Sequence, residues 1–550
     1  MIFGESPRTL GRGYGSVGVG RIMEKIMFRK LFFSVIISCL LSACLLPAED
    51  AKPEAKNDAK SVIAAVEKAM GGTDLKSIQY SGIGSNANLG QGVNPTAAWP
   101  RFDVTSYTRT ISYTDSSSKE ELTRIQGNNS VRGGGAPILG EQKQNNEVAG
   151  NYAWNVAGPN QVAQFGATLE ERKLQIWMTP HGFLKAAKLG NGCAINWDCE
   201  AKVSKKTEAG KPVTVISVGF GKYPMEAYVD DKNMITKVEA KFANPVLGDM
   251  LITTTYSDYK DFAGVKFPTR ITQTQGPYPT FDLMVKDVKP NAPAPLPVPD
   301  GVKTAEAPRN DVSVQLLADG VWYLTGGTHH SLVVEFKDYM AIIEAPLSQE
   351  RSEAVLAEAK RLVINKPVKY LINTHQHFDH SGGLRTYVAE GATIVTHPMN
   401  KAFYDQMFKM KPTIAPDRLA KTPKVPVILP VMDRYVLTDG AQKIEIYAMK
   451  DDNHNEGMLI AYIPAGKILV EADEYTPPPA DAAPPITPPA SSLNLYDNIQ
   501  RLKLDVSKIA PLHGRLVSMA DFYKFLGKEA PKPAENKKVS AAVTPSLTGH

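Results

Sequence analysis

The spacing of apolar positions in the second half of the chain changes repeatedly between strand-like and helix-like. Short apolar runs predict strands at residues 321–325, 331–336, 340–344 and 368–372, and helical spacing predicts a helix around residues 350–362. Strands that alternate with helices are typical of a layered α/β fold. We therefore expect an α/β domain over residues 312–525.

The first half of the chain has a different pattern, in which strand-like segments follow one another between turn signals from about residue 75 to residue 288. Examples are residues 102–113, 213–220, 235–242, 250–256 and 265–273. Helical spacing is confined to residues 61–70 and to one longer segment, residues 169–189. Many short antiparallel strands predict a β-rich domain over residues 61–288 that folds as a curved sheet or half-barrel.

Segments poor in large apolar residues flank and separate these two domains. Residues 45–60 are rich in Ala, Pro and Lys and predict a tether. Residues 289–311 predict a stiff linker, because five prolines fall within residues 289–300. Residues 526–550 are rich in Lys, Pro, Ala and Ser and predict a disordered tail. Two folded domains also agree with the length of 550 residues.

Residues 1–44 carry the pattern of a signal peptide, with Met23 or Met27 as the expected true start. A basic start is followed by an apolar stretch, residues 31–41, that is too short to span a membrane as a helix. The string Leu-Ser-Ala-Cys that ends at Cys44 resembles the bacterial lipobox, which implies lipidation of Cys44 and anchoring to a membrane. The alternative is plain signal cleavage near residues 47–51. Either outcome predicts an exported protein, in the periplasm or anchored as a lipoprotein of a bacterial envelope.

The composition is that of a soluble globular protein, with 43% hydrophobic and 22% charged residues. The formal net charge of +5 is small for this length and long Lys/Arg blocks are absent from the sequence, so nucleic-acid binding is not indicated. Outside the signal the sequence has two cysteines, Cys193 and Cys199. Their spacing in an exported chain predicts a local disulfide, and a metal site is disfavoured because no histidine lies nearby in sequence.

Residue types that bind metals are concentrated directly after the predicted strand 368–372. His375, His377, Asp379 and His380 fall within six consecutive positions. Imidazole and carboxylate are the usual ligands of zinc and related metals. Because side chains two apart at a strand end point to the same side, His375 and His377 can share one cation. Asp379 and His380 lie on the following turn and can face a second cation.

Three further candidates lie downstream, each where a predicted strand meets a loop. His454 precedes the apolar run 459–463, Asp473 ends the run 468–473, and His513 stands at another strand end. Such junctions are where α/β folds build their active sites. The joint occurrence of all three indicates a site rather than three separate structural side chains.

This set of motifs resembles the metallo-β-lactamase superfamily of metallohydrolases, over about residues 312–525 and in the family's order. The resemblance implies a four-layer αβ/βα sandwich with a two-metal site between its sheets. It implies a first metal at His375, His377 and His454, a second at Asp379, His380 and His513, and Asp473 as the bridge. Zinc is the expected metal because histidines predominate, and iron or manganese stay open.

The resemblance also implies hydrolysis of a small-molecule substrate. Two divalent cations lower the pKa of water, and a metal-bound hydroxide attacks an ester, lactone or amide-type carbonyl. Asp379 is the expected catalytic proton acceptor. A bridging Asp473 resembles the lactonase, glyoxalase and general hydrolase branches more than true β-lactamases, and β-lactam hydrolysis stays an alternative. Glu344 stands where many family members carry Asp, and is expected to replace that carboxylate with a longer arm.

A second alternative places the function in the β-rich domain. Residues 259–268 resemble a strand–turn signature of the periplasmic lipoprotein-carrier half-barrel, which implies a concave apolar surface. The chain would then be an envelope lipoprotein that binds an apolar ligand, with a vestigial metal domain. A structural or docking role for the β-rich domain is also open, and the sequence gives no oligomeric state.

Other segments bear less directly on the predicted site. His329 and His330 are expected to form a surface pair, with contact to substrate as the alternative. Residues 476–490 contain seven prolines and form either a lid over the site or an exposed insertion. His397 is expected to be structural, and His181 is not a metal candidate because it lies in the other domain.

Overall fold

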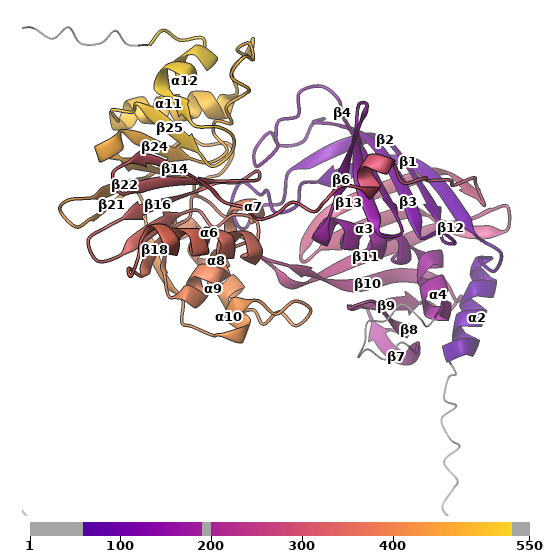
Figure 1. Ribbon diagram of the computed structural model, residues 1–550. Helices are drawn as coiled ribbons and strands as arrows, with labels where there is room; N and C mark the ends of the chain where they lie inside the picture. The colour runs from indigo at the N-terminus through magenta and orange to yellow at the C-terminus, as the bar shows by residue number, and fades with distance from the viewer. Residues whose placement is uncertain (1–58, 190–199, 531–550) are drawn as a thin grey trace, which may run out of the picture. The chain divides into compact units, whose positions relative to one another are not determined.

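The computed structural model describes residues 59–189 and 200–530 (Figure 1). The predicted signal peptide, the lipidation site Cys44 and nearly all of the tether lie outside the described residues. The predicted disulfide between Cys193 and Cys199 and most of the tail lie outside them as well. In the described ranges, no helix is long and apolar enough to cross a membrane.

The β-rich domain is built on one sheet of thirteen strands, in the order β6-β5-β4-β3-β2-β1-β13-β12-β11-β10-β9-β8-β7 (Figure 1). Its strands are β1 (Ser77–Ala87), β2 (Arg101–Ser112), β3 (Ser117–Ile125), β4 (Gln142–Ala149), β5 (Tyr152–Ala157), β6 (Asn160–Gln164), β7 (Lys202–Glu208), β8 (Lys211–Phe220), β9 (Tyr223–Val229), β10 (Ile235–Asn244), β11 (Gly248–Phe262), β12 (Val265–Gln275) and β13 (Tyr278–Pro290). Neighbouring strands are antiparallel, and β1 pairs with β13 in the middle of the sheet. The prediction of a curved antiparallel sheet is therefore confirmed.

One face of this sheet forms a core with three helices. Alternating positions of β10, β11 and β12, among them Val238, Ile252 and Phe267, are fully buried. They belong to one apolar cluster with Val66 of α2 (Ala59–Met70) and Phe183. The predicted helix over residues 61–70 is thus present and covers the sheet with its apolar side.

The predicted single helix over residues 169–189 is wrong, because the structure has two helices there. The first, α3, runs over Gly166–Trp177 and the second, α4, over Pro180–Leu189. Pro180 has no backbone N–H to continue the first helix and is well suited to begin the second. At the break, the Met178 carbonyl accepts a hydrogen bond of 2.6 Å from the Tyr256 hydroxyl. The break therefore lets both helices follow the curved sheet.

The second domain contains two sheets. The larger has the order β14-β15-β16-β17-β18-β19-β20 and the smaller the order β21-β22-β23-β24-β25-β26. The larger consists of β14 (Ser313–Ala318), β15 (Val321–Thr325), β16 (Ser331–Glu335), β17 (Met340–Ile343), β18 (Val368–Ile372), β19 (Thr393–Thr396) and β20 (Val427–Pro430). The smaller consists of β21 (Arg434–Thr438), β22 (Lys443–Ala448), β23 (Leu459–Ile463), β24 (Ile468–Glu471), β25 (Lys508–Pro511) and β26 (Val517–Ser518).

Three apolar clusters show that these sheets lie inside a four-layer sandwich (Figure 1). Side chains of both sheets, such as Val334 and Val470, share the central cluster. The outer face of the larger sheet packs on helices that include α6 (Gln349–Leu362), α8 (Leu384–Glu390) and α9 (Lys401–Lys409), with α10 (Arg418–Lys421). The outer face of the smaller sheet packs on α11 (Ala490–Leu502) and α12 (Met519–Phe525). The predicted αβ/βα layering is confirmed.

Short helical turns complete the described elements. They are α5 (Asp300–Lys303), α7 (Phe378–Ser381), η1 (Pro398–Asn400) and η2 (Pro464–Gly466). Of these, α7 matters for function, because it carries two of the predicted ligands.

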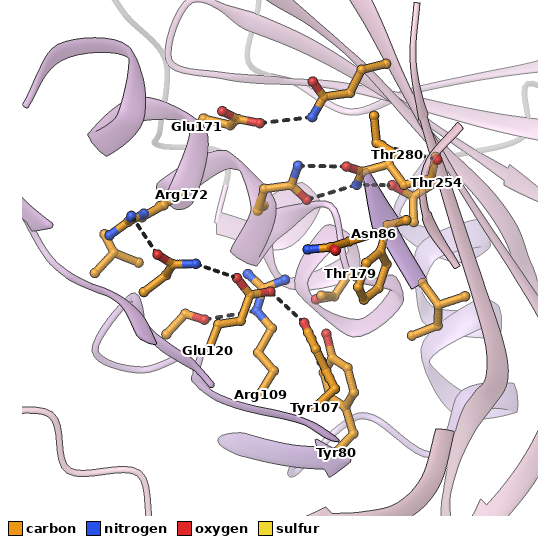
Figure 2. A pocket seen from close by; sticks show the side chains of 18 of the residues that line it. Tyr80, Asn86, Tyr107, Arg109, Glu120, Glu171, Arg172, Thr179, Thr254 and Thr280 are labelled. Carbon is orange, nitrogen blue, oxygen red and sulfur yellow. Dashed lines mark hydrogen bonds between the residues drawn. The ribbon is translucent and has the colours of Figure 1, made fainter. Parts of the chain in front are cut away.

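The β-rich domain also contains a cavity of about 380 Å³ beside α3 (Figure 2). Its lining mixes aromatic rings with charged side chains, including Tyr80, Tyr107, Arg109, Glu120 and Glu171. Carboxamides also line it and bond to one another, as in the 3.1 Å hydrogen bond from the Gln273 amide to Gln175. This polar lining differs from the apolar surface that the lipoprotein-carrier resemblance implies.

Candidate metal centre

The His-x-His-x-Asp-His segment begins where β18 leaves the larger sheet. The backbone stays extended as far as His377 and then turns into the four-residue helix α7, which carries Asp379 and His380. His375 and His377 are fully buried, and their ring centroids lie 4.4 Å apart. A Cβ at Gly382, directly after α7, would lie 2.1 Å from the Leu347 carbonyl oxygen. The turn can therefore close only because a glycine stands there.

The three downstream candidates lie at strand ends, as predicted. His454 precedes β23, and its backbone N–H donates to Asp452 Oδ1 at 2.7 Å. Asp473 follows β24 in a left-handed backbone conformation, with φ +63°. His513 follows β25. The structure brings all three to the His-x-His-x-Asp-His segment.

The first group of side chains contains His375, His377, His454 and Asp473, whose ligand atoms lie within 4.8 Å of one another. His377 Nδ1 lies 3.0 Å from His454 Nε2. Asp473 Oδ2 lies 3.2 Å from His375 Nε2 and 3.1 Å from His454 Nε2. The three histidines assigned to the first metal thus surround one point.

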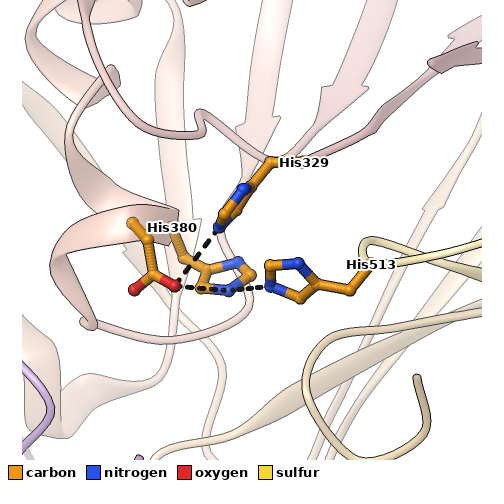
Figure 3. A group of neighbouring side chains, drawn as sticks. His329, His380 and His513 are labelled. Carbon is orange, nitrogen blue, oxygen red and sulfur yellow. Dashed lines mark hydrogen bonds and ion pairs between the residues drawn. The ribbon is translucent and has the colours of Figure 1, made fainter. Parts of the chain in front are cut away.

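The second group contains the predicted residues Asp379, His380 and His513 together with His329, again within 4.8 Å (Figure 3). His380 Nε2 and His513 Nε2 lie 3.0 Å apart. His329 Nε2 lies 3.2 Å from Asp379 Oδ2. His329 therefore contributes a fourth ring to a group that the sequence predicted from three residues.

The prediction that His329 and His330 form a surface pair is wrong, because only 8% and 7% of their surfaces are exposed. The two residues precede β16, and the His330 N–H donates to the Leu512 carbonyl oxygen at 3.0 Å. This contact holds their segment against the residue before His513. The burial of the pair is a tertiary effect that a loop sequence does not reveal.

Asp473 lies between the two groups. Its Oδ1 is 2.9 Å from His513 Nε2, and its Oδ2 is 3.0 Å from His380 Nε2. The same Oδ2 faces His375 and His454 of the first group. This is the position that the resemblance implies for a bridging ligand.

Fixed acceptors determine which nitrogen of three histidines carries the proton. The outward nitrogens donate to oxygens that can only accept: His377 Nε2 to Gly92 O at 2.9 Å, His380 Nδ1 to Glu344 Oε2 at 3.1 Å, and His513 Nδ1 to Thr328 O at 3.1 Å. Whenever one of these rings is neutral, its inward nitrogen therefore carries the lone pair. Hydrogen bonds of this kind orient histidines in metal sites.

The inward nitrogens fit a cation. When both rings are neutral with their protons on the outward nitrogens, His380 Nε2 and His513 Nε2, 3.0 Å apart, face each other with lone pairs, which is unfavourable unless a proton or a metal cation lies between them. In the first group, His375 Nε2 is buried, and its contact with Asp473 Oδ2 at 3.2 Å lacks the geometry of a hydrogen bond. A buried polar atom that is poorly satisfied is costly, and a metal ion shared by His375 and Asp473 would satisfy both.

The ionisation states also suit metal binding. Burial, followed by the charge of His380, lowers the pKa of His375 to about 4, and burial lowers the pKa of His377 well below its ordinary value. Burial alone would raise the pKa of Asp473, but the charges of His380 and His454 hold it well below its ordinary value. The pKa of Asp379 is likewise lowered, against burial, by His380 and by the hydrogen bond with His329. Neutral imidazoles and ionised carboxylates are the forms that bind metals, so His375, His377, Asp379 and Asp473 suit a cation. His380 and His454 differ, because burial alone would lower their pKa values but the charge of Asp473 raises both, so a cation would have to displace their protons.

Glu344 lies behind the second group, as predicted for a supporting carboxylate. It is fully buried and has a left-handed backbone, with φ +78°. Its Oε1 accepts from Asn373 Nδ2 at 2.8 Å, and its Oε2 accepts from the Thr374 hydroxyl and from His380 Nδ1. These bonds fix the His380 ring.

The β1–β2 loop (residues 88–100) of the β-rich domain also reaches the site, which sequence reasoning missed. Gln91 Nε2 donates to Asp379 Oδ1 at 2.8 Å. The Gly92 carbonyl oxygen accepts from both Gln376 Nε2 and His377 Nε2, at 2.8 and 2.9 Å. Neither Gln91 nor Gly92 is a usual metal-ligand type, and both lie more than 280 positions away in sequence. No local signal marks them.

Other sequence candidates lie beside the site or outside it. His397 caps the turn η1 by accepting from the Met399 N–H at 3.4 Å, as expected of a structural histidine. In residues 476–490, Pro477 is buried beside Gly514, whereas most residues from 479 onward are exposed. This segment thus has one end next to His513 and the rest in solvent.

Comparison with known proteins supports a family for this domain. A family model described as the metallo-beta-lactamase superfamily matches residues 324–511. Among solved structures, metallo-beta-lactamases from Pontibacter korlensis and Hirschia baltica are similar, at 20% and 17% sequence identity and a TM-score of 0.30 for both. Each comparison covers 40% of this chain, and 98% and 97% of those chains.

The DIM-1 metallo-beta-lactamase is similar at 16% identity and a TM-score of 0.30, covering 40% of this chain and 96% of that chain. At these identities and TM-scores the solved structures do not by themselves establish the family of this chain. A comparison with curated proteins gave no match. The family match and the four-layer fold agree, and residues 324–511 form a domain of the metallo-beta-lactamase superfamily.

Proposed function

We propose that this protein is a metal-dependent hydrolase with two cations in one centre. His375, His377 and His454 would hold the first cation, Asp379, His380 and His513 the second, and Asp473 would contact both. The observation that carries the proposal is the convergence of inward histidine nitrogens around Asp473. Zinc is the expected metal because histidines predominate, with iron or manganese as alternatives.

Bound cations would supply Lewis-acid activation of water and of the substrate's carbonyl oxygen. The chain's own residues prepare the site for this chemistry. Asp379 stays ionised at neutral pH and its side chain is 31% exposed, so it can accept a hydrogen bond from an entering water and orient it. We propose it as the proton acceptor once bound cations have made that water more acidic. Gln91 Nε2 donates a hydrogen bond to Asp379 Oδ1, and Asp379 Oδ2 faces His329 and His380.

The expected substrate is a small ester, lactone or amide. A bridging aspartate favours these over β-lactams, which stay the alternative. We also propose that the chain is exported and anchored by a lipid at Cys44, on the sequence pattern of residues 1–44 alone.

Hydrolysis assays with purified, zinc-loaded protein test the activity. A panel of lactones, esters, amides and a chromogenic β-lactam is expected to reveal turnover of at least one ester, lactone or amide. A chelator and the His377→Ala substitution should each abolish it. His397→Ala removes a histidine outside both groups and should retain the activity. Turnover unchanged in His377→Ala would contradict a metal-dependent mechanism.

The cavity in the β-rich domain supports a second candidate function, the binding of a small organic anion. Arg109 lines the cavity, and its Nε donates to Ser118 Oγ at 3.0 Å (Figure 2). Burial alone would lower the pKa of Arg109, but the neighbouring Tyr80 and Tyr107 hydroxyls raise it above its ordinary value. The cavity therefore holds the positive charges of Arg109 and Arg172 beside aromatic rings, together with the carboxyl groups of Glu120 and Glu171. We propose that its arginines bind a carboxylate on an apolar body rather than a lipid chain.

Titration calorimetry of the metal-free protein tests this candidate with benzoate and with its neutral analogue benzamide. Benzoate is expected to bind, benzamide to bind at least 10-fold more weakly, and Arg109→Gln to remove the difference. Binding of a fatty acid in place of benzoate would instead support the apolar-ligand alternative. Equal binding of benzoate by Arg109→Gln and the wild type would exclude the cavity as its site.

A further inference from the structure

The β1–β2 loop contacts four consecutive residues of the His-x-His-x-Asp-His segment. Gly92 accepts hydrogen bonds from Gln376 and His377, and Gln91 donates to Asp379. The residue between them, Phe378, packs edge-on against Trp99, with ring centroids 5.7 Å apart. The segment that carries four predicted ligands is therefore covered by the β-rich domain.

This approach is so close that one position of the loop must be glycine. Gly90 has φ +70°, and a Cβ there would lie 2.2 Å from the Phe378 ring. Any side chain at Gly90 would thus strain the backbone and push the loop away from α7. The loop is fitted to the segment rather than resting loosely on it.

A second set of contacts fixes the loop to the other side of the first ligand group. Glu456, two residues after His454, donates its N–H to the Val93 carbonyl oxygen at 2.8 Å. Its carboxylate accepts from Asn94 at 2.7 Å and from Arg132 at 2.8 Å. Arg132 belongs to the β3–β4 loop (residues 126–141), in which Gly134 also donates to the Gln91 carbonyl oxygen at 2.9 Å. The β1–β2 loop is therefore bonded both to the segment that carries His377 and Asp379 and to the residues that follow His454.

These bonds act on the metal ligands themselves. A carbonyl oxygen can only accept, so Gly92 keeps the proton of His377 on Nε2 and directs the lone pair of Nδ1 toward His454. The Gln91 amide donates a hydrogen bond to Asp379 Oδ1 and so fixes the rotation of that carboxylate. A ligand held in place loses less conformational freedom when a cation binds. Hydrogen-bonding partners of metal ligands typically change metal affinity or activity 10- to 100-fold when they are removed.

We propose that the β1–β2 loop belongs to the metal centre. In this proposal Gln91 positions the Asp379 carboxylate and Gly92 positions the His377 ring. The β-rich domain then sets the metal affinity of the hydrolase domain. This inference rests on the proposed function, because it concerns the same site. Gln91 and Gly92 are positioning residues, since they act on the cations through the ligands.

Metal titration of the full chain tests the role of Gln91. Gln91→Met keeps the length of the side chain and removes its N–H donor. Zinc affinity is measured in competition with a chelator, and the absorption spectrum of the cobalt-loaded protein reports ligand geometry. We expect at least one cation to bind about 10- to 100-fold more weakly and the cobalt spectrum to change. Gln161→Met, on the exposed edge strand β6, is the matched control and should behave as the wild type.

Two Gly→Ala substitutions test whether the position of the loop matters for zinc binding, without changing Gln91. Gly90→Ala should displace the loop and weaken zinc binding, whereas Gly150→Ala has a similar φ of +57° and no atom within 4 Å of the added Cβ. Circular dichroism separates displacement of the loop from loss of folding, and if Gly90→Ala does not fold, Gln91→Met decides. Wild-type affinity and an unchanged cobalt spectrum in Gln91→Met would overturn the inference. Absence of zinc binding by the wild type would instead overturn the proposed function.

Discussion

Histidine tautomers, set by single hydrogen bonds, determine what the two ligand groups can bind. The seven ligand candidates could be proposed from sequence because His and Asp recur at strand ends, where side chains from distant segments converge. His329 could not be assigned in this way. It follows a Gly-Gly-Thr turn without periodicity, and its burial depends on the backbone contact between His330 and Leu512. Residue types predict ligands, but only tertiary contacts show which histidines are enclosed.

Replacement of Glu344 by Gln is expected to weaken binding of the second cation about 10- to 100-fold. The carboxyl oxygen that accepts from His380 Nδ1 would be replaced by an amide group, while the bond from Asn373 Nδ2 to Oε1 can persist. Zinc titration against a chelator measures the effect.

Glu474→Gln is the matched control for this substitution. Burial, followed by the charge of Asp452, raises the pKa of Glu474 well above its ordinary value, so an amide there resembles the protonated acid. Equal zinc affinities of Glu344→Gln and Glu474→Gln would show that Glu344 does not support the second group.

Removal of the His329 ring is expected to weaken binding of the second cation about 10-fold and to leave binding of the first cation unchanged. The reason is that His329 Nε2 contacts Asp379 Oδ2, which belongs to the second group. His329 is not one of the four residues that make up the first group. Two-step zinc titration of His329→Ala, with His397→Ala as control, measures both affinities. If the two steps match those of the wild type, His329 only lines the site.

At the scale of elements, the strands and most helices follow from the apolar pattern, and the exceptions have local causes. The bounds of β10 and β12 differ from the prediction by at most two residues. The division between α3 and α4 was missed because both halves share one apolar stripe, and only Pro180 marks the break. The length of β11, which continues to Phe262, was missed because its end is solvent-exposed and lacks alternation. Patterns of burial predict elements best where a face is buried.

The packing of α4 on the sheet is expected to depend on pH through His181. This residue is 1% exposed, its ring stacks against Phe267, and burial lowers its pKa to about 4. The unfolded chain takes up the proton near pH 6.5, so folding stability from this group is complete above pH 6.5. It is lost progressively as the pH falls toward 4, by up to about 3 kcal/mol.

His181→Phe tests this dependence, since it keeps a ring against Phe267 and cannot titrate. Unfolding free energies of the metal-free wild type and variant are measured by denaturant titration between pH 7 and pH 4. The wild type should lose stability relative to the variant as the pH falls. A difference between the two that stays constant with pH would contradict a buried neutral His181.

At the scale of the whole molecule, the β-rich domain contributes to the site of its neighbour. Sequence patterns predicted two domains and a ligand set, but they could not reveal the contact of the β1–β2 loop with His377 and Asp379. Such contacts depend on how the chain folds over several hundred residues. Both ligand groups are expected to be fully formed only in the intact chain.

Metal content shows whether the protein holds two cations joined by Asp473. The full chain is loaded with zinc, dialysed and analysed by mass spectrometry of the metal, together with Asp473→Ala. We expect about two zinc ions per wild-type chain and fewer in Asp473→Ala, because both ligand groups lose a shared carboxylate. Wild-type protein that retains no zinc, or an Asp473→Ala variant that retains the full wild-type content, would contradict it.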